Sequence, residues 1–264
     1  MKYLELVQIA EKVALAAGEL LLDRPTVLEV STKSSEVDVV TQMDRASEAL
    51  ITSMLALLRP DDGLLGEEGA DVASKSGVTW VVDPIDGTVN YLYGLPGWNV
   101  SIGAQIDGQS VAGVVYAPHL TGGTVWSATL GGGAFVSTNK GEPQKIKVNN
   151  SVELSHALLA TGFSYSRETR INQGAKFARI IPEVRDIRRF GAAAVDLCFV
   201  AQGAVDGFFE IGLKPWDLAA GGLIATEAGA TLSNLSGGPA DESFTIAAGP
   251  HLHTNLLKLL NYRR

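Results

Sequence analysis

Two amphipathic segments stand out near the start of the chain. Apolar residues recur at helical spacing over residues 3–23 and again over roughly 42–58, with charged residues between them. Pro25 follows the first segment and the turn-forming stretch 59–63 follows the second, so each segment has a clear end. We therefore expect two amphipathic helices, joined by a polar and then β-prone connection at residues 33–41.

Short apolar runs separated by turn residues come next and are typical of β-strands. A buried strand is expected at Trp80–Asp83, and Pro84 should end it because proline cannot donate to a strand ladder. Residues 100–106 and 111–116 flank a turn at 107–110 and predict a hairpin. Further short strands are expected at 124–127, 134–136 and 144–148.

Beyond residue 150, strand and helix patterns alternate. The expected strands are 157–161, 207–211, 230–233 and 244–248, and the expected helices are 170–181, from Gly191 through Ala201, from Trp216 to near Gly229, and 252–260. Sheets interleaved with helices favour a layered α and β architecture. We expect a single domain over residues 1–264, with an α+β half at about 1–150 and an α/β half at about 151–264.

Charge and cysteine content narrow the class of protein. The net charge of −8 argues against a nucleic-acid-binding surface, although metal ions could still mediate contact with a phosphorylated substrate. Cys198 is the single cysteine, so no intrachain disulfide can form, and we expect it to be a small core side chain. The charged N-terminus is unlike a signal peptide, and no apolar run is long enough to span a membrane. A cytoplasmic protein without a membrane partner is expected.

The end of the expected buried strand carries the first candidate chemistry. A turn at Pro84 would bring Asp83 and Asp86 to one point, whereas a continuing strand would direct them to opposite sides. Gly87 would let a ligand approach the backbone closely, with its own N–H and that of Thr88 available as donors. Two carboxylates beside free amides suit a divalent cation and a phosphate bound together.

Two more carboxylates lie at element boundaries. Glu67 follows a glycine in an acidic loop, where a solvated turn is the simple interpretation, and Asp217 is near a helix start, where an N-cap is the simple interpretation. If both converged with Asp83 and Asp86, four carboxylates and a phosphate would carry roughly −6 charge, which about three divalent ions would balance. Oxygen ligands without a His or Cys cluster favour Mg²⁺ over Zn²⁺.

Three motifs, at matching spacing, resemble those of the inositol monophosphatase-like phosphatases. They are Gly66-Glu67-Glu68, Asp83-Pro84-Ile85-Asp86-Gly87-Thr88 and Lys214-Pro215-Trp216-Asp217-Leu218-Ala219-Ala220-Gly221. Residues 38–44 and 188–198 support the resemblance, which covers nearly the whole chain. It implies a layered αβαβα sandwich and a homodimer. It also implies Mg²⁺-dependent, lithium-sensitive hydrolysis of small phosphomonoesters.

The resemblance further implies two to three Mg²⁺ ions per site. Glu67, Asp83 and the carbonyl of Ile85 would hold the first ion. Asp83, Asp86 and Asp217 would share the second, and Glu67 with waters would hold a weaker third.

Roles in catalysis and substrate binding follow from the same resemblance. The amides of Gly87 and Thr88 would bind phosphate, and Glu67 and Thr88 would position the attacking water, with Asp44 hydrogen-bonded to Thr88. The residues expected to face the substrate are Glu67, Ile85, Asp86, Gly87, Thr88, Arg188, Gly191, Ala192, Ala193, Glu210 and Asp217, with stretch 162–167 at the rim. Relatives often have Ser or Thr where Ala192 stands, so one side-chain hydroxyl is missing here. For Glu210, an exposed charge at a strand edge is the alternative interpretation.

Hydrolysis of inositol-1-phosphate is the leading hypothesis, since the three motifs occur together and Glu210 stands seven residues before Asp217. The same chemistry on fructose-1,6-bisphosphate, histidinol phosphate or a 3′-phosphoadenosine nucleotide stays open, because specificity is a ratio of rates and not a motif. A non-catalytic, partner-binding role also stays open. The acidic charge argues against nucleic acid as that partner.

Overall fold

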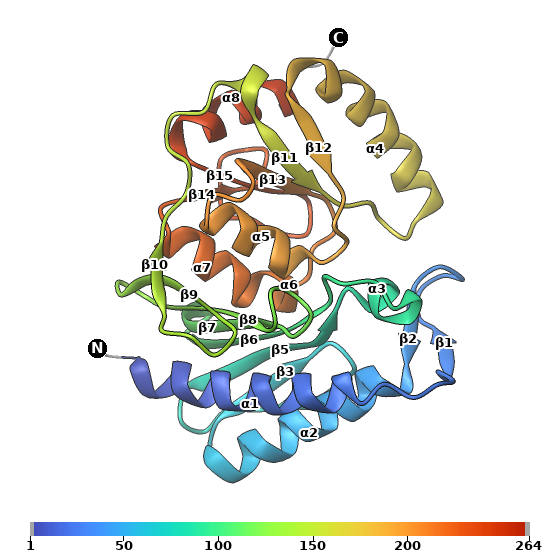
Figure 1. The fold of residues 1–264 in the computed structure, drawn as a ribbon, viewed down its shortest axis with the longest axis vertical. Coiled ribbons are helices and arrows are strands. Elements are labelled where there is room, and N and C mark those ends of the chain that lie inside the picture. Colours follow the sequence, from blue (N-terminus) through green and yellow to red (C-terminus); the bar gives the residue numbers. More distant parts are fainter. Residues whose placement is uncertain (1–2, 262–264) are drawn as a thin grey trace.

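Helix and sheet layers alternate through the computed structural model, which describes residues 3–261 (Figure 1). Helices α1 (Leu4–Leu22) and α2 (Gln42–Leu58) cover the outer face of an eight-stranded sheet. Between this sheet and a five-stranded sheet lie α5 (Ala193–Ala201), α6 (Pro215–Ala219) and α7 (Gly221–Glu227). Helices α4 (Arg167–Ile180) and α8 (Pro250–Asn261) form the last layer. The predicted αβαβα sandwich is confirmed.

The eight-stranded sheet comes from the first half of the chain and is antiparallel except where β3 pairs with β5. Its β6–β7 pair is the predicted hairpin, and Asp107 and Gly108 in its turn have positive φ angles of 52° and 74°. In sheet order the strands are β10 (Gln144–Ile146), β9 (Gly133–Thr138), β8 (Thr124–Thr129), β7 (Gln109–Ala117), β6 (Asn99–Ile106), β5 (Val78–Asp86), β3 (Gly63–Gly66) and β4 (Asp71–Val72).

The five-stranded sheet comes from the second half. Its strands β12, β11 and β13 are parallel neighbours, so their carboxyl ends meet at one edge. In sheet order the strands are β12 (Asp186–Arg188), β11 (Leu158–Thr161), β13 (Gly207–Glu210), β15 (Thr245–Ala248) and β14 (Thr231–Ser233). The remaining elements are a hairpin of β1 (Val30–Thr32) and β2 (Val39–Thr41), helix α3 (Thr88–Tyr93), and the short helices η1 (Leu154–His156) and η2 (Ile181–Glu183).

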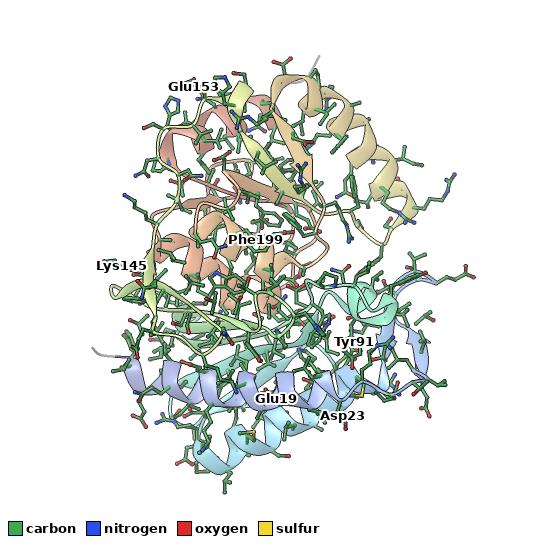
Figure 2. The ribbon with its side chains drawn as sticks, in the orientation of Figure 1. Glu19, Asp23, Tyr91, Lys145, Glu153 and Phe199 are labelled. Carbon is green, nitrogen blue, oxygen red and sulfur yellow. The ribbon has the colours of Figure 1, made fainter. Side chains whose placement is uncertain are left out.

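Three apolar clusters join the layers. Trp80 lies in the cluster that joins α1 and α2 to the large sheet, and Trp126 and Leu197 lie in the cluster between the two sheets. Phe199 packs against that central cluster, where Figure 2 places it between the layers. Leu159 lies in the third cluster, under α8. Within residues 3–261, no helix combines the length and the apolar content needed to cross a membrane.

Strand β5 does not end at Pro84 as predicted. It continues to Asp86, and its pairing with β6 shifts register on the way. Asp83 lies opposite Ser101 and Asp86 lies opposite Asn99, so three steps along β5 match two along β6. This extra residue is a β-bulge, a feature that tolerates a proline and redirects side chains. The bulge brings the two carboxylates to one side, which is the outcome that we had expected from a turn.

The single helix predicted from Trp216 to near Gly229 is instead two helices, α6 and α7, which separate at Ala220. The break lies where the chain presses directly on the large sheet. A β-carbon on Gly113 of β7 would lie 2.8 Å from the α-carbon of Ala220, and one on Gly103 of β6 would lie 2.7 Å from the β-carbon of Ala219. Glycines in the sheet therefore let α6 and α7 approach closely.

Candidate active site

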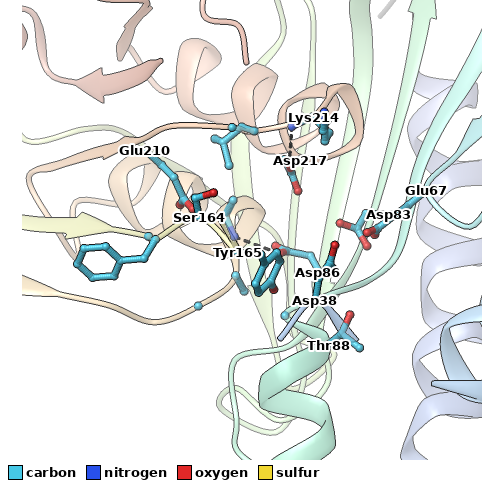
Figure 3. Close-up of a pocket in the computed structure, with 18 of the residues that line it drawn as sticks. Asp38, Glu67, Asp83, Asp86, Thr88, Ser164, Tyr165, Glu210, Lys214 and Asp217 are labelled. Atoms are coloured by element: carbon cyan, nitrogen blue, oxygen red, sulfur yellow. Dashed lines mark hydrogen bonds between the residues drawn. The ribbon is translucent and has the colours of Figure 1, made fainter. Parts of the chain in front are cut away.

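A cavity of about 600 Å³ lies where the ends of β3 and β5 face the segments that follow β11, β12 and β13 (Figure 3). The edge formed by the carboxyl ends of parallel strands is where ligands bind in many α/β proteins. Most of the residues predicted from the sequence line this cavity: Glu67, Asp83, Ile85, Asp86, Gly87, Thr88, Gly191, Ala192, Ala193, Glu210 and Asp217. The stretch 162–166 lines it too.

The structure places Arg188 outside the cavity, contrary to our expectation. Its side chain is exposed and forms an ion pair of 2.5 Å with Asp186, whereas the next residue, Arg189, lines the cavity. Successive side chains of an extended chain point to opposite sides, so neighbouring arginines at the end of β12 diverge. The sequence offers two adjacent arginines without indicating which one turns inward.

Glu67 reaches the cavity through the parallel pairing of β3 with β5. Gly66 lies opposite Val82 in that pairing, and the backbone N–H of Glu67 donates to the carbonyl of Val82 at 3.2 Å. Parallel neighbours end at the same edge, so Glu67 arrives beside Asp83. Its Oε1 atom lies 2.9 Å from Nζ of Lys33.

The Glu67–Glu68 loop is not a solvated turn. Lys33, from the β1–β2 hairpin, pairs with both glutamates, and buried Glu48 of α2 accepts the backbone N–H of Glu68 at 2.8 Å. Glu48 also accepts the N–H of Ala70 at 3.0 Å. The acidic loop is therefore held from both sides.

Three of the four predicted carboxylate ligands form a tight cluster. Asp83, Asp86 and Asp217 each offer an oxygen, and these oxygens lie within 4.8 Å of one another. Burial and then the neighbouring carboxylates raise the pKa of Asp83 well above its usual range. Burial and the charge of Asp86 raise the pKa of Asp217 in the same way. An all-oxygen cluster whose charges repel one another fits a hard divalent cation, which would neutralise them.

Asp86 is also held by hydrogen bonds. Its carboxylate oxygens accept the backbone N–H groups of Ala193 at 3.1 Å and Ala194 at 2.8 Å, and the side-chain amide of Asn99 at 2.8 Å. Burial raises the pKa of Asp86 to about 6, while these three donors oppose the rise. Asp217 sits in the first turn of α6, where Oδ2 accepts the backbone N–H of Lys214 at 2.6 Å. It is thus the third residue of its helix and not the N-cap.

Thr88 and Asp44 form a buried pair beside the cluster. The Thr88 hydroxyl lies 3.0 Å from Oδ1 of Asp44 and 3.1 Å from the carbonyl oxygen of Ile85. Asp44 does not line the cavity but lies behind Thr88, where its other oxygen accepts both the N–H and the hydroxyl of Thr41 as part of the cap of α2. Helix α2 therefore fixes the carboxylate that orients Thr88.

The opposite wall of the cavity carries Glu210 (Figure 3). Burial raises the pKa of Glu210 to about 8, and the charge of Arg189 opposes that rise. Glu210 is therefore not an exposed charge at a strand edge. Gly191 has a φ of 91° and Gly87 has a φ of 88°, so both positions need glycine for their backbone conformation. The two glycines lie close together, since a β-carbon on Gly87 would lie 3.2 Å from the carbonyl oxygen of Gly191.

Sequence reasoning missed Lys33, Asp38, Asn99 and Arg189. Lys33 and Asp38 lie at the two ends of the β1–β2 turn, and no local signal distinguishes them from the polar residues between them. Asn99 is completely buried opposite Asp86. The one sequence signal for it is a polar amide immediately before the expected apolar strand at residues 100–106.

The cavity places a cluster suited to a metal ion beside backbone amides and a wall that carries Glu210. Together with the layered fold, it defines a metal-dependent phosphomonoesterase. The chain belongs to the inositol monophosphatase family, whose sequence model matches residues 2–263.

Individual relatives agree with this assignment. The inositol-1-monophosphatase SuhB of Mycobacterium tuberculosis (strain H37Rv) is 47% identical over 238 residues, which cover 88% of this chain and 81% of that protein. The Nus factor SuhB of Escherichia coli (strain K12) is 38% identical over 241 residues, covering 88% of this chain and 86% of that protein. The crystal structure of the extragenic suppressor protein suhB from Bartonella henselae superposes with a TM-score of 0.90 at 33% identity, covering 98% of this chain and 100% of that one.

Proposed function

We propose that this protein hydrolyses inositol-1-phosphate to myo-inositol and phosphate with the help of Mg²⁺. The observation that carries the proposal is the cavity itself, in which Asp83, Asp86 and Asp217 face Glu210 across a space of about 600 Å³. One side suits a cation and phosphate, and the other offers an acceptor for hydroxyl groups. The name of the relative from Mycobacterium tuberculosis supports the choice of substrate.

Two to three Mg²⁺ ions are proposed for the site. Asp83, Asp86 and Asp217 would hold one, and Glu67 and the carbonyl of Ile85 would complete the ligand set with Asp83. When bound, Mg²⁺ supplies neutralisation of the phosphoryl oxygens and lowers the pKa of a coordinated water.

The protein's own groups are proposed to bind the phosphate and to orient the attacking water. The amides of Gly87 and Thr88 are proposed to hold the phosphate. The Thr88 hydroxyl, which donates to Asp44, would accept a hydrogen bond from the attacking water, with Glu67 on the water's other side. Phosphoryl transfer needs positioning and charge more than covalent chemistry, so the Thr88 hydroxyl, which has no adjacent His or Lys base, is proposed as an orienting group and not as a nucleophile.

On the substrate's other end, Glu210 and Asp217 are proposed to accept hydrogen bonds from polyol hydroxyls, with the backbone of Gly191, Ala192 and Ala193 beside them. A buried acceptor that is left without its hydroxyl partner is costly, so such contacts discriminate between substrates.

Phosphate release from inositol-1-phosphate, with and without Mg²⁺, tests the proposal. We expect turnover that needs Mg²⁺ and is inhibited by lithium. A pure, folded protein that releases no phosphate, or that works equally well in excess chelator, would contradict it. Comparing kcat/KM with fructose-1,6-bisphosphate, histidinol phosphate and a 3′-phosphoadenosine nucleotide tests the alternative substrates, and the highest ratio identifies the preferred one.

A second candidate function is binding of a macromolecular partner, alone or in addition to catalysis. The relative from Escherichia coli is named a Nus factor, which favours this possibility. Capture of partners by an Asp83→Asn variant would show binding that does not depend on turnover. Absence of any stoichiometric partner with both wild type and variant would leave the hydrolase as the sole proposal.

A further inference from the structure

Strand β6 places Asn99 beside a proposed metal ligand. Asn99 begins β6, is completely buried and lies opposite Asp86 of β5. Counting from the pair of Asp83 with Ser101, an unbroken ladder would instead place Trp98 opposite Asp86. The β-bulge in β5 therefore makes Asn99 the neighbour of Asp86. Residues directly opposite each other present their side chains to the same face of a sheet, so the amide of Asn99 reaches the carboxylate.

The side-chain amide of Asn99 is directed at Asp86 through one of its two ends. Nδ2 donates to Oδ2 of Asp86 at 2.8 Å and to the backbone carbonyl oxygen of Asp86 at 3.4 Å. Both of these partners are acceptors, so the NH₂ end of the amide must face Asp86. Oδ1, at the other end, is buried and has no hydrogen-bond partner among residues 3–261. The protein thus uses Asn99 as a donor to Asp86 and gives its acceptor no donor.

The donors around Asp86 are divided unequally between its two carboxylate oxygens. Oδ2 accepts from Asn99 and from the backbone N–H of Ala194, both at 2.8 Å, whereas Oδ1 accepts from the N–H of Ala193 at 3.1 Å. Each carboxylate oxygen has two lone pairs. The described donors therefore use both lone pairs of Oδ2 and leave one lone pair of Oδ1 free. Asp86 can offer a cation one oxygen, Oδ1, and not both.

The number of oxygens that a carboxylate offers separates Mg²⁺ from Ca²⁺. Mg²⁺ demands near-octahedral coordination with short bonds, which a single fixed oxygen from each carboxylate satisfies. Ca²⁺ takes more oxygens in a flexible geometry and often binds a carboxylate through both of its oxygens. A carboxylate whose second oxygen is already occupied by donors therefore suits Mg²⁺ and denies Ca²⁺ a ligand.

We propose that Asn99 is a positioning residue that makes the cluster of Asp83, Asp86 and Asp217 prefer Mg²⁺ over Ca²⁺, because it occupies Oδ2 of Asp86 and leaves Oδ1 for the ion. This inference rests on the proposed Mg²⁺-dependent function and adds a residue outside the cluster that sets which metal binds. Removing the amide frees a lone pair on Oδ2 and lets the carboxylate rotate. Ca²⁺ then gains an oxygen, while Mg²⁺ loses a fixed ligand.

Calorimetric titration of metal-free protein with MgCl₂ and with CaCl₂ tests the proposal. Asn99→Ala should bind Mg²⁺ on the order of 10-fold more weakly than wild type, while its Ca²⁺ affinity stays within about twofold, so selectivity for Mg²⁺ falls by about fivefold or more. Asn149→Ala is the matched control. The amide of Asn149 also donates to a carboxylate at 2.8 Å, that of Asp206, and neither residue is among the described residues that line the cavity. This variant should keep the wild-type selectivity.

The outcomes separate this inference from the proposed function. An equal loss of affinity for both metals in Asn99→Ala would make Asn99 a structural residue only, and unchanged affinities would leave it no role; either result overturns the inference. If Asn99→Ala fails to fold by circular dichroism, Asn99→Leu repeats the comparison with a side chain of similar shape and no donor. Wild type that hydrolyses inositol-1-phosphate with Mg²⁺ while the variant keeps its selectivity overturns this inference alone. Wild type that binds no Mg²⁺ overturns the hydrolase proposal and this inference together.

Discussion

The carboxylate of Asp86 accepts a hydrogen bond of 2.8 Å from the backbone N–H of Ala194, which lies 108 positions later in the chain. Ala193 donates to the other oxygen of the same carboxylate, and α5 has no side-chain cap of its own. Asp86 therefore caps this helix from another layer of the fold. The cap also holds Gly191 and Ala192, just before α5, against the end of β5. The acidic cluster and the part of the cavity wall formed by Gly191 and Ala192 thus both depend on the side chain of Asp86.

Replacing Asp86 by asparagine should lower kcat/KM for inositol-1-phosphate by about 100-fold or more and weaken Mg²⁺ binding by at least about 10-fold. An amide offers one weaker ligand oxygen, and its NH₂ group cannot accept from the start of α5. Phosphate release and calorimetric titration with Mg²⁺ measure the two effects. Asp186→Asn, which changes an exposed carboxylate on β12, is the control and should behave as wild type. Full activity in Asp86→Asn would remove this residue from the site.

Thr88→Ala should reduce kcat by about 100-fold or more while KM changes little, because the hydroxyl is proposed to orient the attacking water and not to bind the substrate's polyol. Thr88→Ser keeps the hydroxyl within reach of Asp44 and should retain most of the activity. Steady-state kinetics on both variants separates kcat from KM. Equal loss in the serine and alanine variants would show that the methyl group, and not the hydroxyl, matters at this position.

Local chemistry explains why much of the site could be predicted from the sequence. The run from Asp83 to Thr88 places two carboxylates, a glycine and a hydroxyl at one strand end, and Pro84 within it indicates an irregularity that can bring the two carboxylates to one side. The helices α1 and α2 could be predicted equally well, since their apolar periodicity is long and regular. The backbone conformation that brings Asp83 and Asp86 together nevertheless differs from the prediction, because it is a β-bulge and not a turn.

Contacts between distant segments explain what could not be predicted. Lys33 meets Glu67 only because the β1–β2 hairpin folds over the end of β3, and nothing near Lys33 in the sequence encodes that contact. The choice between Arg188 and Arg189 depends on the rotation of a three-residue strand, which is too short to show alternation. The break at Ala220 likewise depends on how closely the chain approaches Gly113.

The raised pKa of Glu210 makes stability depend on pH. Its pKa lies at about 8 in the folded protein, against an ordinary 4.5, so the folded state binds the extra proton between these values. Stability from this group is therefore highest at low pH and falls as pH rises from about 4.5 to about 8, by a few kcal/mol at most. Urea unfolding of metal-free wild type and Glu210→Gln should show the wild type losing stability relative to the variant across that window. A difference that stays constant with pH would contradict the raised pKa.

Gly113→Ala should destabilise the protein by about 1–3 kcal/mol, because the new β-carbon would meet the backbone of Ala220 and neither the sheet nor α7 can yield freely. Gly174→Ala is the matched control in α4, where a β-carbon meets nothing within 4 Å, and it should stabilise by about 0.5–1 kcal/mol through helix propensity. Urea midpoints at unchanged slope measure both effects. Since α6 carries Asp217, pushing α6 and α7 off the sheet should also lower Mg²⁺ affinity in Gly113→Ala but not in Gly174→Ala. Equal stability of the two variants would mean that the close approach at Ala220 is not what holds the helices against the sheet.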